Sequence, residues 1–171
     1  MDVMAAVRGR RSVRRFEDRP VPKALEDKLV EALLWAPSAG NLQSRKFYLV
    51  RNKDVKKHLA EAALGQSFIA RAPLVVVGCT DAGIGARYGE RGTFLYTIQD
   101  VATSIMCMML AAHGEGLGSV WVGAFQEARV ARVLGLPGHL RPVAVVPVGY
   151  PARVPAAPPR VSREEAVVEI D

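Results

Sequence analysis

The chain has 171 residues, 50% of them hydrophobic and 23% charged, which is typical of one globular domain with its own core. The formal net charge of +6 allows binding of nucleic acid, an anionic surface or a small anion. The one dense basic cluster, residues 8–15, contains no lysine and no interleaved aromatic side chain of the kind that stacks bases. We therefore favour a small anion and keep a basic nucleic-acid-binding module as the alternative from another class.

The cysteines, the N-terminal residues and the apolar runs indicate the cellular compartment. Cys79 and Cys107 lack the spacing of a zinc site and the density of a secreted disulfide scaffold, and the three histidines form no metal-ligand pattern. Residues 1–16 contain five arginines and no apolar segment, so we expect no signal peptide. The longest apolar run, Val101–Ala112, is too short to span a bilayer. We expect a cytoplasmic protein that does not cross a membrane.

Helices and strands alternate along the chain. The predicted elements are helix 2–8, helix 23–35, strand 46–50, helix 54–64, strand 73–79, helix 94–113, strand 119–124, helix 127–134 and strand 141–148. Pro142 and Pro147 lack a donor N–H, so we expect them at the ends or at a bulge of the last strand. Four prolines between residues 151 and 159 predict an extended C-terminal arm. The pattern indicates one domain over residues 1–171, of an α+β or α/β layered class with helices covering a mixed sheet.

The first segment that bears on chemistry is Arg10–Phe16, with the sequence Arg-Arg-Ser-Val-Arg-Arg-Phe. If this segment is extended, the side chains of Arg10, Ser12 and Arg14 lie on one side. Guanidinium groups bind phosphate through paired, charge-assisted hydrogen bonds. The segment therefore predicts an anion-binding strip, and a solvated basic loop is the alternative.

Three further segments carry weaker signals. Residues 35–43 form a turn whose polar side chains could bind the edge of a flat heteroaromatic ligand: Ser38, Asn41 and Gln43. In residues 116–125, Gly123 would let the main chain approach a ring, although the spacing does not match a dinucleotide-binding fingerprint. The proline arm delivers Arg160 as a second anion contact. Each segment has a plainer alternative. Residues 35–43 also fit an ordinary helix-to-strand connection, residues 116–125 fit a buried strand with a bulge, and Arg160 fits an exposed surface arginine.

Taken together and in this order, the four segments resemble the nitroreductase family of FMN-dependent oxidoreductases. The similarity extends from Val7 to Val168, and its strongest parts are the Arg-Arg-Ser start and the Ala-Pro-Ser-Ala-Gly-Asn-Leu-Gln turn. The resemblance implies a nitroreductase-like fold with a central mixed, mainly antiparallel sheet. It also implies an obligate homodimer with two FMN sites at the interface, in which the arm of residues 151–171 embraces the partner subunit.

The resemblance further implies which residues contact the flavin. The phosphate and the ribityl chain would contact Arg10 and Ser12, and Arg11 would lie close by. Arg160 would close on the phosphate from the C-terminal arm. Arg14 would lie near N1 and O2 of the ring. Those facing the flavin bound mainly by the other subunit are Ser38, Asn41 and Gln43. Those lining one ring face are Val122, Gly123 and Ala124.

The implied activity is electron transfer from NADH or NADPH through flavin N5 to a small organic acceptor such as a nitroaromatic or a quinone, in a ping-pong cycle. Because hydride moves on and off the flavin, no protein residue must act as acid or base, and the sequence contains no nucleophile–base constellation. Other reactions in the same fold stay open: dehydrogenation, dehalogenation or fragmentation of the flavin. A protein that holds flavin with little turnover is a further alternative.

The sequence departs from the family pattern at two places. Ser44-Arg45 stands where the family usually has Pro-Trp, and Arg45 is expected to be an exposed loop residue that, like Arg87, could attract nicotinamide phosphates. Residues 81–93 are expected to be a short Gly-rich segment where larger relatives have a helical cover. Two aromatic residues there are weak candidates for substrate contact: Tyr88, with a surface alternative, and Phe94, with a core alternative.

Overall fold

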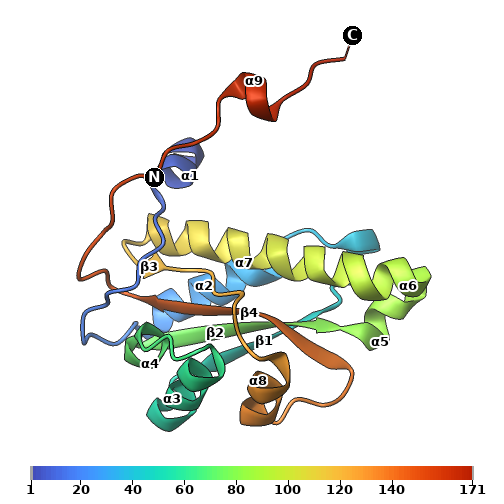
Figure 1. Ribbon diagram of the computed structural model, residues 1–171, viewed down its shortest axis with the longest axis horizontal. Helices are drawn as coiled ribbons and strands as arrows, with labels where there is room; N and C mark the ends of the chain where they lie inside the picture. The colour runs from blue at the N-terminus through green and yellow to red at the C-terminus, as the bar shows by residue number, and fades with distance from the viewer. Residues whose placement is uncertain (1, 171) are drawn as a thin grey trace.

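A computed structural model describes residues 2–170 and has three layers, with helices on both faces of one sheet (Figure 1). The helices are α1 (Val3–Gly9), α2 (Lys23–Trp35), η1 (Ala39–Asn41), α3 (Lys53–Ala62), α4 (Phe68–Arg71), α5 (Ala82–Gly85), η2 (Ala86–Tyr88), α6 (Gly89–Arg91), η3 (Gly92–Tyr96), α7 (Thr97–Gly114), α8 (Glu127–Leu134) and α9 (Arg163–Ala166). The strands are β1 (Arg45–Val50), β2 (Leu74–Asp81), β3 (Gly118–Ser119) and β4 (Leu140–Gly149).

The sheet has the strand order β1-β2-β4-β3, and each neighbouring pair is antiparallel. A single parallel bridge joins Ser12 to Ser119 beside β3, so the sheet is mixed at that edge. The register of β2 against β4 shifts between Gly78 and Cys79, where Cys79 lies opposite Pro142. A bulge therefore accommodates Pro142, as we expected for a residue that has no N–H to donate to the ladder. The predicted layered α+β class is confirmed.

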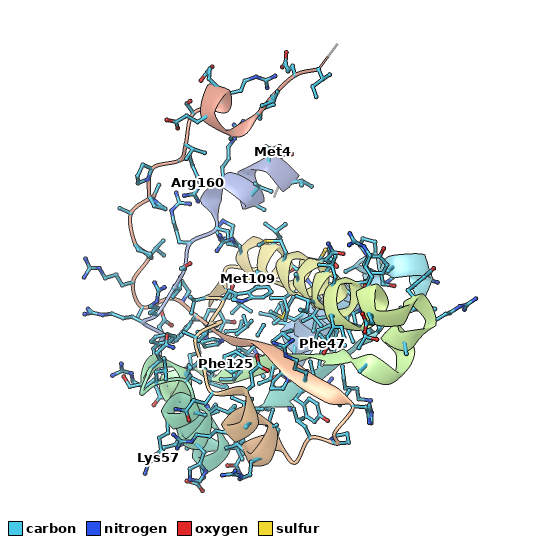
Figure 2. The ribbon with its side chains drawn as sticks, turned by 45° about the vertical axis from the view of Figure 1, so that its right-hand side comes forward. Met4, Phe47, Lys57, Met109, Phe125 and Arg160 are labelled. Carbon is cyan, nitrogen blue, oxygen red and sulfur yellow. The ribbon has the colours of Figure 1, made fainter. Side chains whose placement is uncertain are left out.

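Each face of the sheet carries its own apolar core. The side chains between the sheet and helices α2 and α7 include Leu29, Leu33, Val101, Ile105 and Met109. Those between the other face and helices α3, α4 and α8 include Leu59, Ile69, Val77 and Val130. Figure 2 labels Phe47 and Met109 from the first core and Phe125 from the edge of the second. The long helix α7 thus lies directly on the sheet.

The region before α7 is helical, contrary to the expected Gly-rich loop. The Asp81 carboxylate accepts a hydrogen bond from the Ile84 N–H and starts a series of short helical turns that continues through Tyr96 into α7. The continuous run Ala82–Gly114 contains a window long and apolar enough, by length and composition, to cross a membrane. Its residues Val101 and Ile105 are fully buried against the sheet, which identifies the run as a core helix.

The strand predicted over residues 119–124 is shorter than expected. Only Gly118 and Ser119 belong to β3, and Val122 forms an isolated bridge with Val145. Because Ser119 pairs with Val148, the next residue along the chain, Val120, faces Pro147, which has no N–H to donate. The proline therefore interrupts the ladder.

The two ends of the chain lie together along the β3 edge. The Val13 N–H donates to the Ser119 carbonyl at 3.0 Å, and Gly118 permits this approach because an added Cβ would lie 2.7 Å from the Val13 side chain. Phe16 forms a bridge with Pro151, at the start of the C-terminal arm. The arm and α1 then project to the same side of the molecule (Figure 1). This pairing brings the two predicted anion-binding segments into contact.

Candidate cofactor site

A surface cavity of about 320 Å³ lies between the N-terminal segment and the C-terminal arm. Its lining residues are Arg10, Arg11, Ser12, Arg14, Pro155, Ala156, Pro158 and Arg160. The backbone explains this gathering, since the Ala152 N–H donates to the Arg15 carbonyl at 2.9 Å and sets the direction of the arm. Figure 2 shows Arg160 on the arm, near the N-terminal segment. Four of the residues predicted to surround a phosphate and its sugar chain therefore share one cavity with Arg14.

The charges around this cavity are largely uncompensated. Within residues 2–170, no ion pair involves Arg10, Arg14 or Arg160. The Arg14 guanidinium lies 5.9 Å from the centre of the Phe68 ring, and one Arg160 nitrogen donates to the Pro159 carbonyl at 3.1 Å. Neither contact neutralises a positive charge. Several guanidinium groups held together without carboxylates favour binding of an anion.

Arg11 has a different local role from its neighbours. Its Nη1 lies 2.6 Å from the Arg8 carbonyl, 3.0 Å from that of Gly9 and 2.9 Å from that of Arg10. These carbonyls end α1, so the Arg11 guanidinium caps the helix and interacts favourably with its negative end. Arg11 lines the cavity mainly as a structural cap.

The residues predicted to line a ring face lie just beyond β3. Val122 is buried and exchanges two backbone hydrogen bonds with Val145, at 2.9 and 3.0 Å. Gly123 and Ala124 are exposed. A Cβ added to Gly123 would have Trp121 as its nearest neighbour, at an ordinary contact distance of 3.7 Å. The main chain is therefore open to solvent at Gly123.

The turn that carries Ser38, Asn41 and Gln43 is sharply bent. The Ser38 hydroxyl accepts a hydrogen bond from the Gln43 N–H at 3.0 Å. Gly40, Asn41 and Gln43 have φ values of 53°, 53° and 54°, in the left-handed region. This turn contacts the first turn of α7, whereas His113 near the other end of α7 lies against Gly9, next to Arg10. Within one chain, the turn and the arginine cavity therefore lie at opposite ends of α7.

Arg45 is not the exposed loop residue that the sequence suggested. It begins β1 and is 9% exposed, and its guanidinium donates to the carbonyls of Leu34, Ala36 and Pro37 at 3.1, 2.7 and 3.0 Å. Burial lowers the pKa of Arg45, and the nearby Asp100 carboxylate opposes this shift. These carbonyls lie at or just beyond the C-terminal end of α2, where positive charge is favourable. Arg45 therefore anchors the backbone before the turn.

Asp100 was not among the residues predicted from the sequence, and Ser44 stood out only as a departure from the family pattern. Both are buried, and the Ser44 hydroxyl donates to the Asp100 carboxylate at 2.7 Å. One signal for Asp100 was present in the sequence: a carboxylate near the start of an otherwise apolar helix. If the helix is buried, such a carboxylate needs a hydrogen-bonding partner, because aspartate is rarely buried alone.

Neither substrate candidate lines the arginine cavity, and Tyr88 lies beside the turn. The Tyr88 hydroxyl lies so close to Gly40 that a Cβ there would be 2.1 Å from it, and the Tyr88 ring meets the Tyr96 ring edge-on at 5.8 Å. Phe94 is 66% exposed, so the core alternative for this residue is wrong. Arg87 is exposed as well.

A larger cavity, of about 660 Å³, lies next to residues 16–21 and 70–73. Three carboxylates line it, those of Glu17, Asp18 and Glu26, and Arg51 binds Glu26. The buried Lys56 ammonium donates to the Ala72 carbonyl at 2.6 Å. Burial lowers the pKa of Lys56. Because these carboxylates line the larger cavity and, among residues 2–170, none lines the smaller one, the smaller cavity is the better candidate for an anion. Among residues 2–170, no cluster of His, Cys, Asp and Glu could hold a metal ion.

Comparison with known proteins agrees with this geometry. A protein of Methanothermobacter thermautotrophicus described as an NADH dehydrogenase/NAD(P)H nitroreductase is 35% identical over 91% of this chain and 80% of its own length. The FMN reductase [NAD(P)H] of Bacillus subtilis is 28% identical over 95% of this chain and 71% of its own. The NADPH:FMN oxidoreductase of Vibrio harveyi, solved with NAD⁺, superposes with a TM-score of 0.92 at 25% identity, covering 99% of this chain and 77% of that chain. The profile of the nitroreductase family matches residues 7–68 and 62–150, and the chain belongs to that family.

Proposed function

We propose that the protein binds FMN and transfers electrons from NADH or NADPH to a small organic acceptor. The observation that carries the proposal is the cavity that Arg10, Arg14 and Arg160 line, where no carboxylate within residues 2–170 pairs with any of the three. The named activities of the Bacillus subtilis and Vibrio harveyi relatives support the same conclusion.

The residues present fit the cofactor group by group. Arg10 and Arg160, with the Ser12 hydroxyl, supply donors for a doubly charged phosphate and the first part of the ribityl chain. Gly123 leaves open main chain against which a flat ring can lie, between Val122 and Ala124. The cavity therefore provides charge for one end of FMN and an unobstructed surface for the other.

FMN, when bound, supplies an N5 that accepts and releases hydride. The protein's task is to bind, orient and stabilise charge. Arg14 is the candidate for a fixed positive charge near N1 and O2, where the reduced ring is negative, and this favours reduction. No side chain need move a proton. We propose a ping-pong cycle in which the nicotinamide and the acceptor use the same open ring face in turn.

The site requires a second copy of the chain. The arginine cavity and the turn of Ser38, Asn41 and Gln43 lie at opposite ends of α7. Asp100 and His113, which contact the two groups, are about 20 Å apart along the axis at about 1.5 Å rise per residue. A homodimer resolves the separation, because the turn of one subunit can face the flavin held by the arginines of the other.

Exposed apolar side chains support the same homodimer. They lie on α1, at the end of α2, on α7 and on the arm, and include Val3, Met4, Val7, Leu34, Trp35, Met106, Val161 and Ile170. Trp35 is 82% exposed, which is unusual for so large an apolar surface. We propose that the arm embraces the partner subunit and covers part of this surface. Because the two cysteines are unpaired, we also propose a reducing, cytoplasmic location.

The test is the visible absorbance of the purified dimer, recorded before and after anaerobic addition of NADH or NADPH. We expect a flavin band that either nucleotide bleaches and that a nitroaromatic or a quinone restores. Light scattering should give the mass of two chains. A protein that gains no flavin band on addition of FMN would contradict the proposal. Tight FMN that neither nucleotide reduces would favour another flavin reaction or a flavin-holding protein.

A further inference from the structure

A buried carboxylate ties the turn of residues 38–43 to the core. Asp100 is 3% exposed and lies in the first turn of α7. Its Oδ1 accepts a hydrogen bond from the Ala39 N–H at 2.9 Å, and its Oδ2 accepts one from the Ser44 hydroxyl at 2.7 Å. Ala39 begins the turn and Ser44 directly follows it. One side chain therefore holds both ends of the turn.

Arg45 fixes the backbone that leads into the same turn. Its guanidinium donates to the carbonyls of Ala36 and Pro37, and one nitrogen also lies 3.4 Å from the Asp100 carbonyl. The guanidinium is thus surrounded by main-chain oxygens at the end of α2 and the start of α7. Charged groups with this many partners in a buried setting keep one geometry, because any departure leaves a buried group unsatisfied.

The backbone of the turn explains why such anchoring is needed. Asn41 and Gln43 both have φ near +53°. For Gln43 this conformation costs about 1–2 kcal/mol and persists only where the surroundings enforce it, whereas asparagine, as at position 41, adopts it more readily. Gly40 avoids the cost, but the Tyr88 hydroxyl against it leaves no room for a side chain. The turn is therefore held in a conformation that it would not adopt alone, as in preorganised ligand sites.

We propose that Asp100 is a positioning residue for the flavin reaction. Acting through Ser44 and the Ala39 N–H, it holds the turn so that its polar groups meet the edge of the flavin ring held by the other subunit. Asp100 itself touches neither the flavin nor the nicotinamide. This inference rests on the proposed function and assigns a role to a residue that lies outside the cavity.

The test compares Asp100→Asn and Ser44→Ala with the wild-type dimer. The control, Ala60→Gly, loosens α3 on the opposite face of the sheet and separates general destabilisation from the specific effect. We expect faster hydrogen exchange at the amides of residues 39–45 in both variants and unchanged exchange there in the control. We also expect a shifted flavin absorption band and anaerobic reduction by NADH that is slower by roughly tenfold, since a misplacement of about 1 Å can cost about a hundredfold and the turn keeps its other contacts.

Each outcome has one meaning. Faster exchange with an altered flavin band and slower reduction supports the inference. If both variants bind FMN, keep the wild-type band and reduce at the wild-type rate, Asp100 positions nothing that the flavin senses. If Ala60→Gly produces the same spectral change, the effect is general destabilisation and the inference is wrong. A wild-type protein that binds no FMN refutes the proposed function, and the flavin role of Asp100 with it.

Discussion

Replacing Arg160 with glutamine should weaken the binding of FMN while leaving the binding of riboflavin almost unchanged. Riboflavin has the same ring and ribityl chain but no phosphate, and the Arg160 side chain lines the cavity together with Arg10 and Ser12. If that cavity holds the phosphate, the lost interaction belongs to FMN alone. Arg163 is a matched control, because it lies on the same arm, does not line the cavity and pairs with Glu169.

The magnitude follows from the exposure of the two cavity arginines. A hydrogen bond to a charged group contributes about 1.5–3 kcal/mol, which corresponds to about 10- to 150-fold in Kd. Arg160 is exposed and screened by solvent, so we expect about tenfold for Arg160→Gln. Arg10 is half-buried, so Arg10→Gln should lie nearer the upper limit. The double variant should lose less FMN-binding free energy than the two single variants lose together, because both side chains would bind one phosphate.

The assay is the quenching of flavin fluorescence, titrated with FMN and with riboflavin at low and high salt. The loss in Arg160→Gln should shrink as salt rises, since screening weakens the wild-type contact. Arg163→Gln should match the wild type for both ligands. Equal weakening of FMN and riboflavin by Arg160→Gln would place the phosphate elsewhere, and so would no weakening of either.

Three further predictions follow from other residues. Arg14→Ala should weaken FMN binding by about 1.5–3 kcal/mol and slow anaerobic flavin reduction in stopped-flow traces, and unchanged values for both would remove Arg14 from the ring. Arg45→Met should lower the free energy of unfolding by about 3 kcal/mol, measured in urea at fixed protein concentration, because buried carbonyls lose their donor; a loss below about 1 kcal/mol would show that water replaces it. Burial raises the pKa of Cys79 from 9.0 to about 12, so the folded protein should resist alkylation at pH 8. The stability that the neutral thiol contributes should be lost as the pH rises from 9.0 toward 12. Rapid labelling of Cys79 in the folded protein would contradict this prediction.

Local sequence signals predicted the regular elements well. Helix α2 begins at Lys23 and ends at Trp35 as expected, because Pro22 and Pro37 bound an apolar face with helical spacing. Helix α8 ends at Leu134, where Gly135 takes the left-handed conformation that closes a helix. The gathering of Arg10, Ser12 and Arg160 was expected only from the resemblance to the nitroreductase family, because nothing in the local sequence of either segment indicates the other.

The features that sequence did not predict depend on distant partners. The length of β3 is limited by Pro147, which lies on another strand. Arg45 looked like a loop arginine because its acceptors are carbonyls at the end of α2, and carbonyls carry no sequence signature. The helical turns between Asp81 and Tyr96 were missed because glycines there suggested a loop, whereas Gly85 and Gly92 pack closely with neighbouring atoms. In each case tertiary contact outweighed local preference.

The assembly of the arginine cavity from residues 10–14 and residues 155–160 has a consequence for biosynthesis. A growing polypeptide can build the sheet and α7 before Arg160 leaves the ribosome, but it cannot yet enclose a phosphate. On the proposed site, binding of FMN would therefore follow the folding of residues 155–160 against residues 10–14. A stop codon placed between 153 and 159 keeps every strand and α7 but removes Arg160, so the shortened chain should fold and bind FMN more weakly.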